Sequence, residues 1–286
     1  MSKIEKIFRR EEEGVAGAIT VVLVIALVAV LLSYYVTIIV PSTMSQYEFT
    51  MDQGLDSSIL QFSSDVVSLQ STGTIGAIDF QNFVLESGSI PIFSPPSYAS
   101  LSFISSVRNG SFSYFVNASD SITGLPVSFF YGGGGMLIAN GNRFYDPGFL
   151  FYEAGAVYQV SSLSSTNPIP LSLSTILEYS PGTNTYYFNL YNIYGTAQEV
   201  TSGSVNLEIE YSGTSQLSAT LTQNLPVYVG FSSPDAAEVF LKGVTTLFPG
   251  AVITPSHLGV KFVIPSGVNV VFSVSSYAIS EYGLVK

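Results

Sequence analysis

Residues 15–40 form an apolar segment of 26 positions without a single charged side chain. A helix rises about 1.5 Å per residue, so this segment is long enough to cross a hydrocarbon core of about 30 Å. It exceeds the roughly 7–15 apolar residues of a secretory signal core, and no small-residue A-x-A cleavage pattern follows it. Tyr34 and Tyr35, near its outer end, suit the membrane–water interface. We predict a retained transmembrane helix.

The basic residues give this helix an orientation. Four of the nine Lys and Arg residues lie within the first ten positions, and only five follow residue 40. The four are Lys3, Lys6, Arg9 and Arg10. Basic residues flanking a membrane helix stay on the cytoplasmic side. We therefore predict a cytoplasmic tail over residues 1–14 and an extracellular region over residues 41–286.

The exported region is acidic and poor in charge. It holds sixteen acidic and five basic side chains, and charged residues make up 10% of the whole chain. Nucleic acid is excluded as an expected partner, because binding it requires a basic surface that displaces counterions. The polarity of a surface made of hydroxyls and amides changes little when carboxylates are protonated. Such a surface suits an acidic medium, and low charge is also common in surface-layer and filament proteins.

The chain contains no cysteine. Disulfides, thiolate metal sites and thiol enzymes are thereby excluded. About 210 residues beyond the expected stalk are enough to bury a core without such cross-links. We expect no cofactor.

Residues 41–72 have helical periodicity, with apolar side chains every three or four positions over seven turns. These residues are Met44, Tyr47, Met51, Leu55, Ile59, Phe62, Val66 and Leu69. We predict a helical stalk that continues the membrane helix outward, with a kink at Pro41. The apolar stripe must be covered, either by the chain's own distal domain, which we favour, or by neighbouring copies.

From residue 73 onward the pattern changes to short runs of alternating apolar and polar residues. Strands are predicted at 127–131, 186–194, 205–211, 217–221, 227–231, 260–264 and 268–278. Asn109-Gly110 predicts a hairpin turn, and Ser233-Pro234 predicts the start of a helix over residues 233–247. We expect residues 73–286 to form a mainly antiparallel, β-sandwich-like domain, with a possible lobe boundary near 161–170.

The sequence contains few residues and motifs that are typical of a catalytic site. His257 is the single histidine, and no G-x-S-x-G motif accompanies it, so we expect an ordinary loop residue. Glycines 132–135 lack the following Lys and Ser/Thr of a phosphate loop and predict a flexible turn between strands. An exported hydrolase remains the alternative. It requires two carboxylates, or His257 with a carboxylate and a hydroxyl, to converge in one pocket.

Two groups of carboxylates have a regular spacing. Glu48, Asp52 and Asp56 recur every four residues, which places them on one helical face. They predict a solvated face, or else a divalent-ion site between helices. Glu208 and Glu210 alternate with apolar residues, as on the exposed side of a strand. A glycosidase pair would have to form in three dimensions.

Two N-x-[ST] sequons begin at Asn109 and Asn117. In an exported chain both are candidate glycosylation sites. We therefore expect a surface glycoprotein if either is occupied.

The N-terminal pattern resembles a group of archaeal cell-surface proteins with a type IV pilin-like membrane helix. The residues that carry this resemblance are the basic flank, Val40-Pro41, Tyr47-Glu48-Phe49, and the later segments 134–138, 142–145 and 151–157. The resemblance implies cleavage by a prepilin-type peptidase near Gly14 or Val15, and helices that pack into a filament. A non-cleaved anchor is the alternative, since Glu11 to Glu13 separate Arg10 from Gly14.

We therefore expect a single-pass surface protein with a structural, adhesive or binding role in the cell envelope. Its expected partners are the lipid bilayer, copies of itself or other envelope and pilus subunits. The alternative is an exported, membrane-tethered hydrolase or carbohydrate-binding protein.

Overall fold

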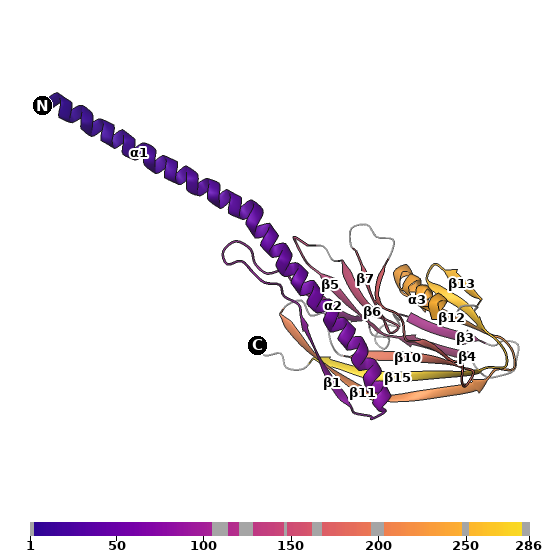
Figure 1. Ribbon diagram of the computed structural model, residues 1–286. Helices are drawn as coiled ribbons and strands as arrows, with labels where there is room; N and C mark the ends of the chain where they lie inside the picture. Colours follow the sequence, from indigo (N-terminus) through magenta and orange to yellow (C-terminus); the bar gives the residue numbers. More distant parts are fainter. Residues whose placement is uncertain are drawn as a thin grey trace.

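A long helical rod leads into a β-rich domain (Figure 1). The structure, a computed structural model, describes residues 3–104, 114–119, 128–145, 148–161, 168–195, 203–247 and 252–281. The rod consists of α1 (Lys3–Tyr34), a π-helical turn (Tyr35–Ile39) and α2 (Val40–Thr72). It ends at Gly73, which takes the left-handed conformation with φ of 63°.

The π-helical turn has a cause in the sequence. Proline lacks an N–H, and its ring collides with the carbonyl four residues earlier, which for Pro41 belongs to Thr37. A wider turn relieves this collision, and the Val40 N–H donates to the carbonyl of Tyr35, five residues back. The rod changes direction between α1 and α2 (Figure 1), as the predicted kink requires.

The described residues of the domain form three five-stranded sheets. The first has the order β1-β11-β15-β10-β9, and its β10–β15 pair is parallel. Its strands are β1 (Ile78–Val84), β9 (Leu177–Ser180), β10 (Thr185–Gly195), β11 (Ser204–Thr220) and β15 (Asn269–Glu281). The other pairings within this sheet are antiparallel, so the expected mainly β domain behind an N-terminal helix is confirmed.

The remaining two sheets are wholly antiparallel. One has the order β13-β14-β12-β3-β4 and the other the order β2-β5-β6-β7-β8. The former is built from β3 (Tyr114–Ser119), β4 (Ser128–Gly133), β12 (Leu225–Phe231), β13 (Ile253–Ser256) and β14 (Gly259–Ile264). The latter is built from β2 (Ala99–Ile104), β5 (Gly135–Asn140), β6 (Phe149–Glu153), β7 (Ala156–Val160) and β8 (Ile169–Ser172).

The core is shared between the sheets and α2. The apolar stripe of α2 from Met51 to Leu69 is buried against the domain, so the expectation that the chain covers its own stripe is confirmed. The Phe62 ring meets that of Tyr152 on β6 edge to face, with centroids 5.2 Å apart. The Tyr277 hydroxyl on β15 donates to the carbonyl of Val66 at 2.8 Å. Each large side chain fully buried here contributes about 1.5–3 kcal/mol.

The helix predicted near residue 233 is confirmed as α3 (Pro234–Leu247). The Ser233 hydroxyl accepts a hydrogen bond from the Ala236 N–H at 3.1 Å, which caps its first turn. The helix packs against β7, β12 and β14. The predicted strands at 205–211 and 217–221 belong to one strand, β11, which continues through an irregularity between Tyr211 and Gly213.

Two further expectations require correction. The predicted hairpin at Asn109-Gly110 is wrong, since β2 pairs with β5 in one sheet and β3 pairs with β12 and β4 in another. The turn residues themselves lie outside the described residues. Glycines 132–135 do join β4 to β5, but Gly133 serves close packing: a Cβ there would lie 2.2 Å from the Tyr114 ring. The possible lobe boundary near 161–170 falls between β7 and the start of β8, which are paired neighbours, and residues 162–167 of it lie outside the described residues.

Candidate functional site

The segment of the rod from Gly17 to Tyr34 is apolar and uncovered. Every residue from Gly17 to Tyr34 is exposed, whereas burial against the domain begins at Val40. In the described part of the chain, this helix alone is long and apolar enough to span a membrane. Its exposed half therefore presents an apolar surface that could anchor the protein in a bilayer.

Directly beyond this segment, the carboxylate of Glu48 joins α2 to the domain. Its two oxygens accept hydrogen bonds from the backbone N–H groups of Arg143, Phe144 and Tyr145, at 2.9, 2.8 and 2.8 Å. The Ser97 hydroxyl donates a fourth hydrogen bond. Glu48 is fully buried, so its charge is compensated by these four donors.

This arrangement brings together two of the segments that carried the sequence resemblance. Glu48 belongs to the Tyr47-Glu48-Phe49 triplet, and residues 142–145 lie in the connection between β5 and β6. The rings of Phe49 and Tyr145 also meet edge to face, with centroids 5.3 Å apart. Both motifs therefore hold the helix to the domain.

Asp52 and Asp56 lie one and two turns further along the same helix face. Asp52 is 3% exposed and accepts a hydrogen bond from the Asn140 side-chain amide at 3.0 Å. Burial, followed by the neighbouring Asp56 charge, raises the pKa of Asp52 to about 6, while the Asn140 hydrogen bond lowers it. Burial also raises the pKa of Asp56. The predicted solvated face is wrong, because β5 and its following loop cover Glu48 and Asp52.

The alternative of a divalent ion at this face gains no support. No group of three or more His, Cys, Asp or Glu side chains suited to a metal ion occurs in the described residues. Glu48, the first carboxylate of the series, already accepts hydrogen bonds from four donors of the protein. Buried oxygen Oδ1 of Asp56 has no hydrogen-bond partner among the described residues.

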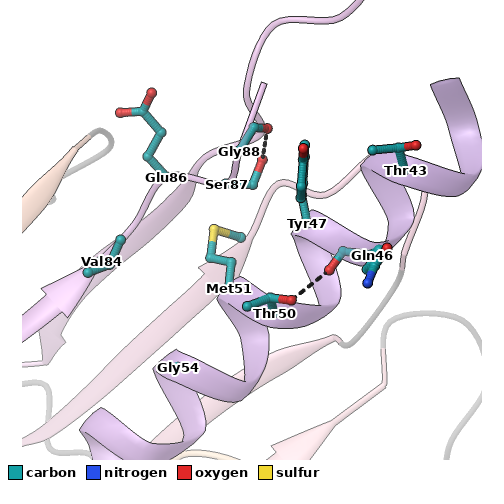
Figure 2. A pocket seen from close by; sticks show the side chains of 10 residues that line it. All are labelled: Thr43, Gln46, Tyr47, Thr50, Met51, Gly54, Val84, Glu86, Ser87 and Gly88. Carbon is teal, nitrogen blue, oxygen red and sulfur yellow. Dashed lines mark hydrogen bonds between the residues drawn. The ribbon is translucent and has the colours of Figure 1, made fainter. Parts of the chain in front are cut away.

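A groove of about 580 Å³ runs between the start of α2 and the chain that follows β1 (Figure 2). Its lining residues are Thr43, Gln46, Tyr47, Thr50, Met51, Gly54, Val84, Glu86, Ser87 and Gly88. The Tyr47 ring stands between the helix and the Gly88 backbone, where an added Cβ would lie 2.7 Å from the ring. This contact leaves Tyr47 39% exposed, unlike the rest of the predicted stripe.

The lining of this groove is a mixture of hydroxyl, amide and apolar side chains. Hydroxyl groups, apolar side chains and the single carboxylate of Glu86 face it, and the Thr50 hydroxyl is already engaged with the Gln46 carbonyl at 2.9 Å. None of its lining residues is a histidine or a cation. The groove offers apolar contacts and hydroxyl hydrogen bonds.

The candidate catalytic residues are dispersed. His257 lies in the exposed turn between β13 and β14. Glu208 and Glu210 lie on β11, opposite Phe80 and Ile78 of β1. This sheet is not the one that contains β13 and β14, which flank His257. Their partial exposure agrees with the predicted outward strand face.

Of the glycosylation and processing candidates, all but Asn109 lie within the described residues. Asn117 is exposed on β3, between Tyr228 of β12 and Phe130 of β4. Asn109 lies outside the described residues. Gly14 and Val15 lie within the continuous helix α1. Glycan occupancy and cleavage at these positions stay predictions.

A buried carboxylate that sequence reasoning missed lies under α3. Glu153, at the end of β6, accepts hydrogen bonds from the hydroxyls of Tyr158 at 2.7 Å and Ser232 at 3.0 Å. Burial raises the pKa of Glu153 to about 7, while these hydrogen bonds lower it. The local signal was weak, since Glu153 stands alone among apolar neighbours. Its hydrogen bonds connect β6 to the start of α3.

Comparison with known proteins found no match to a family model, to a curated protein or to a solved structure.

Proposed function

We propose that this protein is a single-pass surface protein that holds a rigid β domain outside the cell and acts as a structural, adhesive or binding component of the envelope. The observation that carries this proposal is the change of environment along one uninterrupted helix. From Gly17 to Tyr34 its side chains are exposed, and from Val40 onward its apolar stripe is buried against the domain. An exposed apolar helix of this length is stable in the hydrocarbon core of a bilayer.

The basic residues support a cytoplasmic N-terminus. Four basic residues lie before the apolar segment, namely Lys3, Lys6, Arg9 and Arg10. Only five Lys and Arg residues follow residue 40, at the outer end of that segment. The domain would then stand outside the cell. The hydrogen bonds to Glu48 and the burial of the stripe favour a fixed attachment of the domain to its anchor.

A structural, adhesive or binding role is favoured over hydrolysis by the dispersal of the catalytic candidates. His257 lies in an exposed turn, while Glu208 and Glu210 lie on the face of another sheet. Hydrolysis by paired carboxylates or by a histidine would need such groups to converge.

A pilin-like role is the finer form of the proposal. Its support is the basic flank, the long apolar helix and the α2 stripe packed on its own domain. In that form, the charged tail is removed near Gly14 or Val15 and the exposed helix can move from the bilayer into a bundle of neighbouring helices.

Membrane fractionation followed by mass spectrometry of the N-terminus tests the proposal. The protein should remain in carbonate-washed membranes with residues 15–40 intact. A start at Gly14 or Val15 supports the pilin-like form, and an unprocessed N-terminus supports the permanent anchor. A soluble protein that begins after residue 40 overturns both, because the apolar segment would then be a removed signal sequence.

A further inference from the structure

The connection between β1 and β2 returns toward the membrane end of the rod. Its middle part, residues 89–95, is here called the apolar tip, and it lies beside the junction of α1 and α2 (Figure 1). Ile90 in the tip is buried in a small cluster with Val40 and Met44, against which Tyr35 packs. The Phe93 ring meets the Tyr35 ring edge to face, with centroids 5.0 Å apart. The tip is therefore fixed at the level of Tyr35.

That level coincides with the expected outer surface of the membrane. A hydrocarbon core of about 30 Å corresponds to about 20 helical residues at 1.5 Å each. Counted from residue 15, such a span ends at Tyr34. Tyr34 and Tyr35 then lie in the interfacial layer that tyrosine prefers. Phe93 touches one of these two residues.

The tip presents apolar side chains away from the protein. Ile92 is fully exposed and Phe93 is 43% exposed. Ile92 also has a φ of 72°, in the left-handed region that a β-branched residue rarely adopts. A soluble loop would gain from glycine or asparagine at this position. Strained positions persist where they serve a function, and here the strain accompanies an isoleucine that points outward.

The tip is ordered by its own hydrogen bonds. The Ile90 N–H donates to the Ser94 carbonyl at 3.0 Å, and the Ser94 N–H donates back to the Ile90 carbonyl at 2.9 Å. The Phe93 N–H donates to Ile90 as well, and Pro91 has no N–H. These backbone donors need no water, which lowers the cost of entering the headgroup layer.

The charge pattern points to the same surroundings. Residues 87–104 contain no charged side chain, so neither the tip nor its flanking residues in the chain carry a charge that resists transfer toward lipid. Glu86 precedes this stretch, on the side of the groove.

We propose that Ile92 and Phe93 insert into the interfacial layer of the outer leaflet, as a second membrane contact beside the transmembrane helix. This proposal rests on the membrane placement of α1. One helix alone leaves the domain free to tilt and to rotate about the helix axis. A second contact, held to that helix through Tyr35, fixes which face of the domain is turned to the membrane.

The absence of tryptophan from the chain allows a direct test. The full-length Ile92→Trp variant is reconstituted in phosphatidylcholine vesicles, with and without lipids brominated on the upper part of the acyl chain. Ile75→Trp is the matched control, since Ile75 is 73% exposed beyond the far end of α2, about 50 Å along the helix. Leu27→Trp, within the exposed helix, reports insertion of the anchor itself.

We expect Ile92→Trp to emit at shorter wavelength than Ile75→Trp and to be quenched several-fold more strongly by brominated lipid. Equal emission and equal quenching of these two variants, with Leu27→Trp quenched, overturn the membrane contact and leave the anchor intact. Blue-shifted Ile92→Trp emission that brominated lipid does not quench also overturns it, because the tip then lies against another protein copy. Unquenched Leu27→Trp refutes the anchor, and with it the basis of the inference.

Discussion

The backbone N–H of Arg143 donates to the Glu48 carboxylate at 2.9 Å, which joins the beginning of α2 to a loop 95 residues later in the chain. The next two N–H groups of that loop and the Ser97 hydroxyl complete the set of donors. A carboxylate is well suited to this place, because it accepts several hydrogen bonds and donates none. The β5–β6 connection thereby becomes part of the attachment of the domain to its helix.

Removal of the Glu48 carboxylate is predicted to destabilise the protein. Glu48→Ala leaves the buried Ser97 hydroxyl and three partly buried backbone N–H groups without their acceptor, and a buried donor in this position costs about 1–3 kcal/mol. Glu48→Gln keeps one acceptor oxygen but turns an amide N–H₂ toward donors, so it should be destabilised to a smaller extent. Thermal unfolding of the full chain in detergent measures both variants. Glu86→Gln, which removes an exposed carboxylate, is the control, and a Glu48→Ala variant as stable as this control would refute the role.

Because Asp52 is buried, the free energy of unfolding is predicted to fall as the pH rises. Its pKa lies near 6 in the folded protein, against an ordinary value of 3.8. Between these values the folded state binds more protons than the unfolded state, so the free energy of unfolding decreases with rising pH. Asp52→Asn should match the wild type near pH 4 and exceed it near pH 7, by on the order of 2–3 kcal/mol. A pH-independent difference between the two in urea unfolding would argue against this effect.

Alanine substitutions at two glycines that line the groove are predicted to have opposite effects on stability. Gly88→Ala places a Cβ 2.7 Å from the Tyr47 ring and should cost about 1–3 kcal/mol, as overpacking does. Gly54→Ala, on the same groove, meets nothing within 4 Å and should stabilise α2 by about 0.5–1 kcal/mol. Adding Tyr47→Leu should restore part of the stability lost in Gly88→Ala. Equal melting temperatures for the two alanine variants would contradict the packing.

Replacement of Ile92 by glycine should separate stability from membrane contact. Glycine adopts a φ of 72° without the penalty that isoleucine carries, which is of order 1–3 kcal/mol for strained positions. In detergent, Ile92→Gly is therefore expected to unfold at the same or a higher temperature than the wild type. In vesicles it should lose the second contact and tilt more freely, which polarised infrared spectroscopy of oriented bilayers detects. A clear loss of stability in detergent would show that Ile92 has a packing role instead.

The periodic features of the sequence predicted the helices well. The spacing of Met51, Leu55 and Ile59 indicated a buried stripe, and these residues are buried against the β domain. The start of α3 followed from Ser233 and Pro234, a local signal that needs no tertiary partner. Such signals are legible because the helix itself brings neighbours three and four residues apart onto one face.

The carboxylates were not predictable in the same way. Glu48 and Asp52 look like part of a solvated face until residues 140–145 are placed above them, and that contact joins segments about 90 residues apart. The hairpin at Asn109-Gly110 failed for a related reason. The Asn-Gly pair is a local turn signal, but β2 and β3 do not pair with each other because each pairs with a strand from elsewhere in the chain. Sheet pairing and burial of single polar groups depend on such distant partners.

Membrane topology can be decided by labelling single cysteines in intact cells, since the native chain has none. Ser266→Cys lies in the exposed turn between β14 and β15, and Ser2→Cys lies in the basic tail. A membrane-impermeant maleimide is predicted to label Ser266→Cys in intact cells, and to label Ser2→Cys of chains that keep the tail only after permeabilisation. Labelling of Ser2→Cys in intact cells, together with protection of Ser266→Cys, would contradict a surface-exposed domain on a cytoplasm-in anchor.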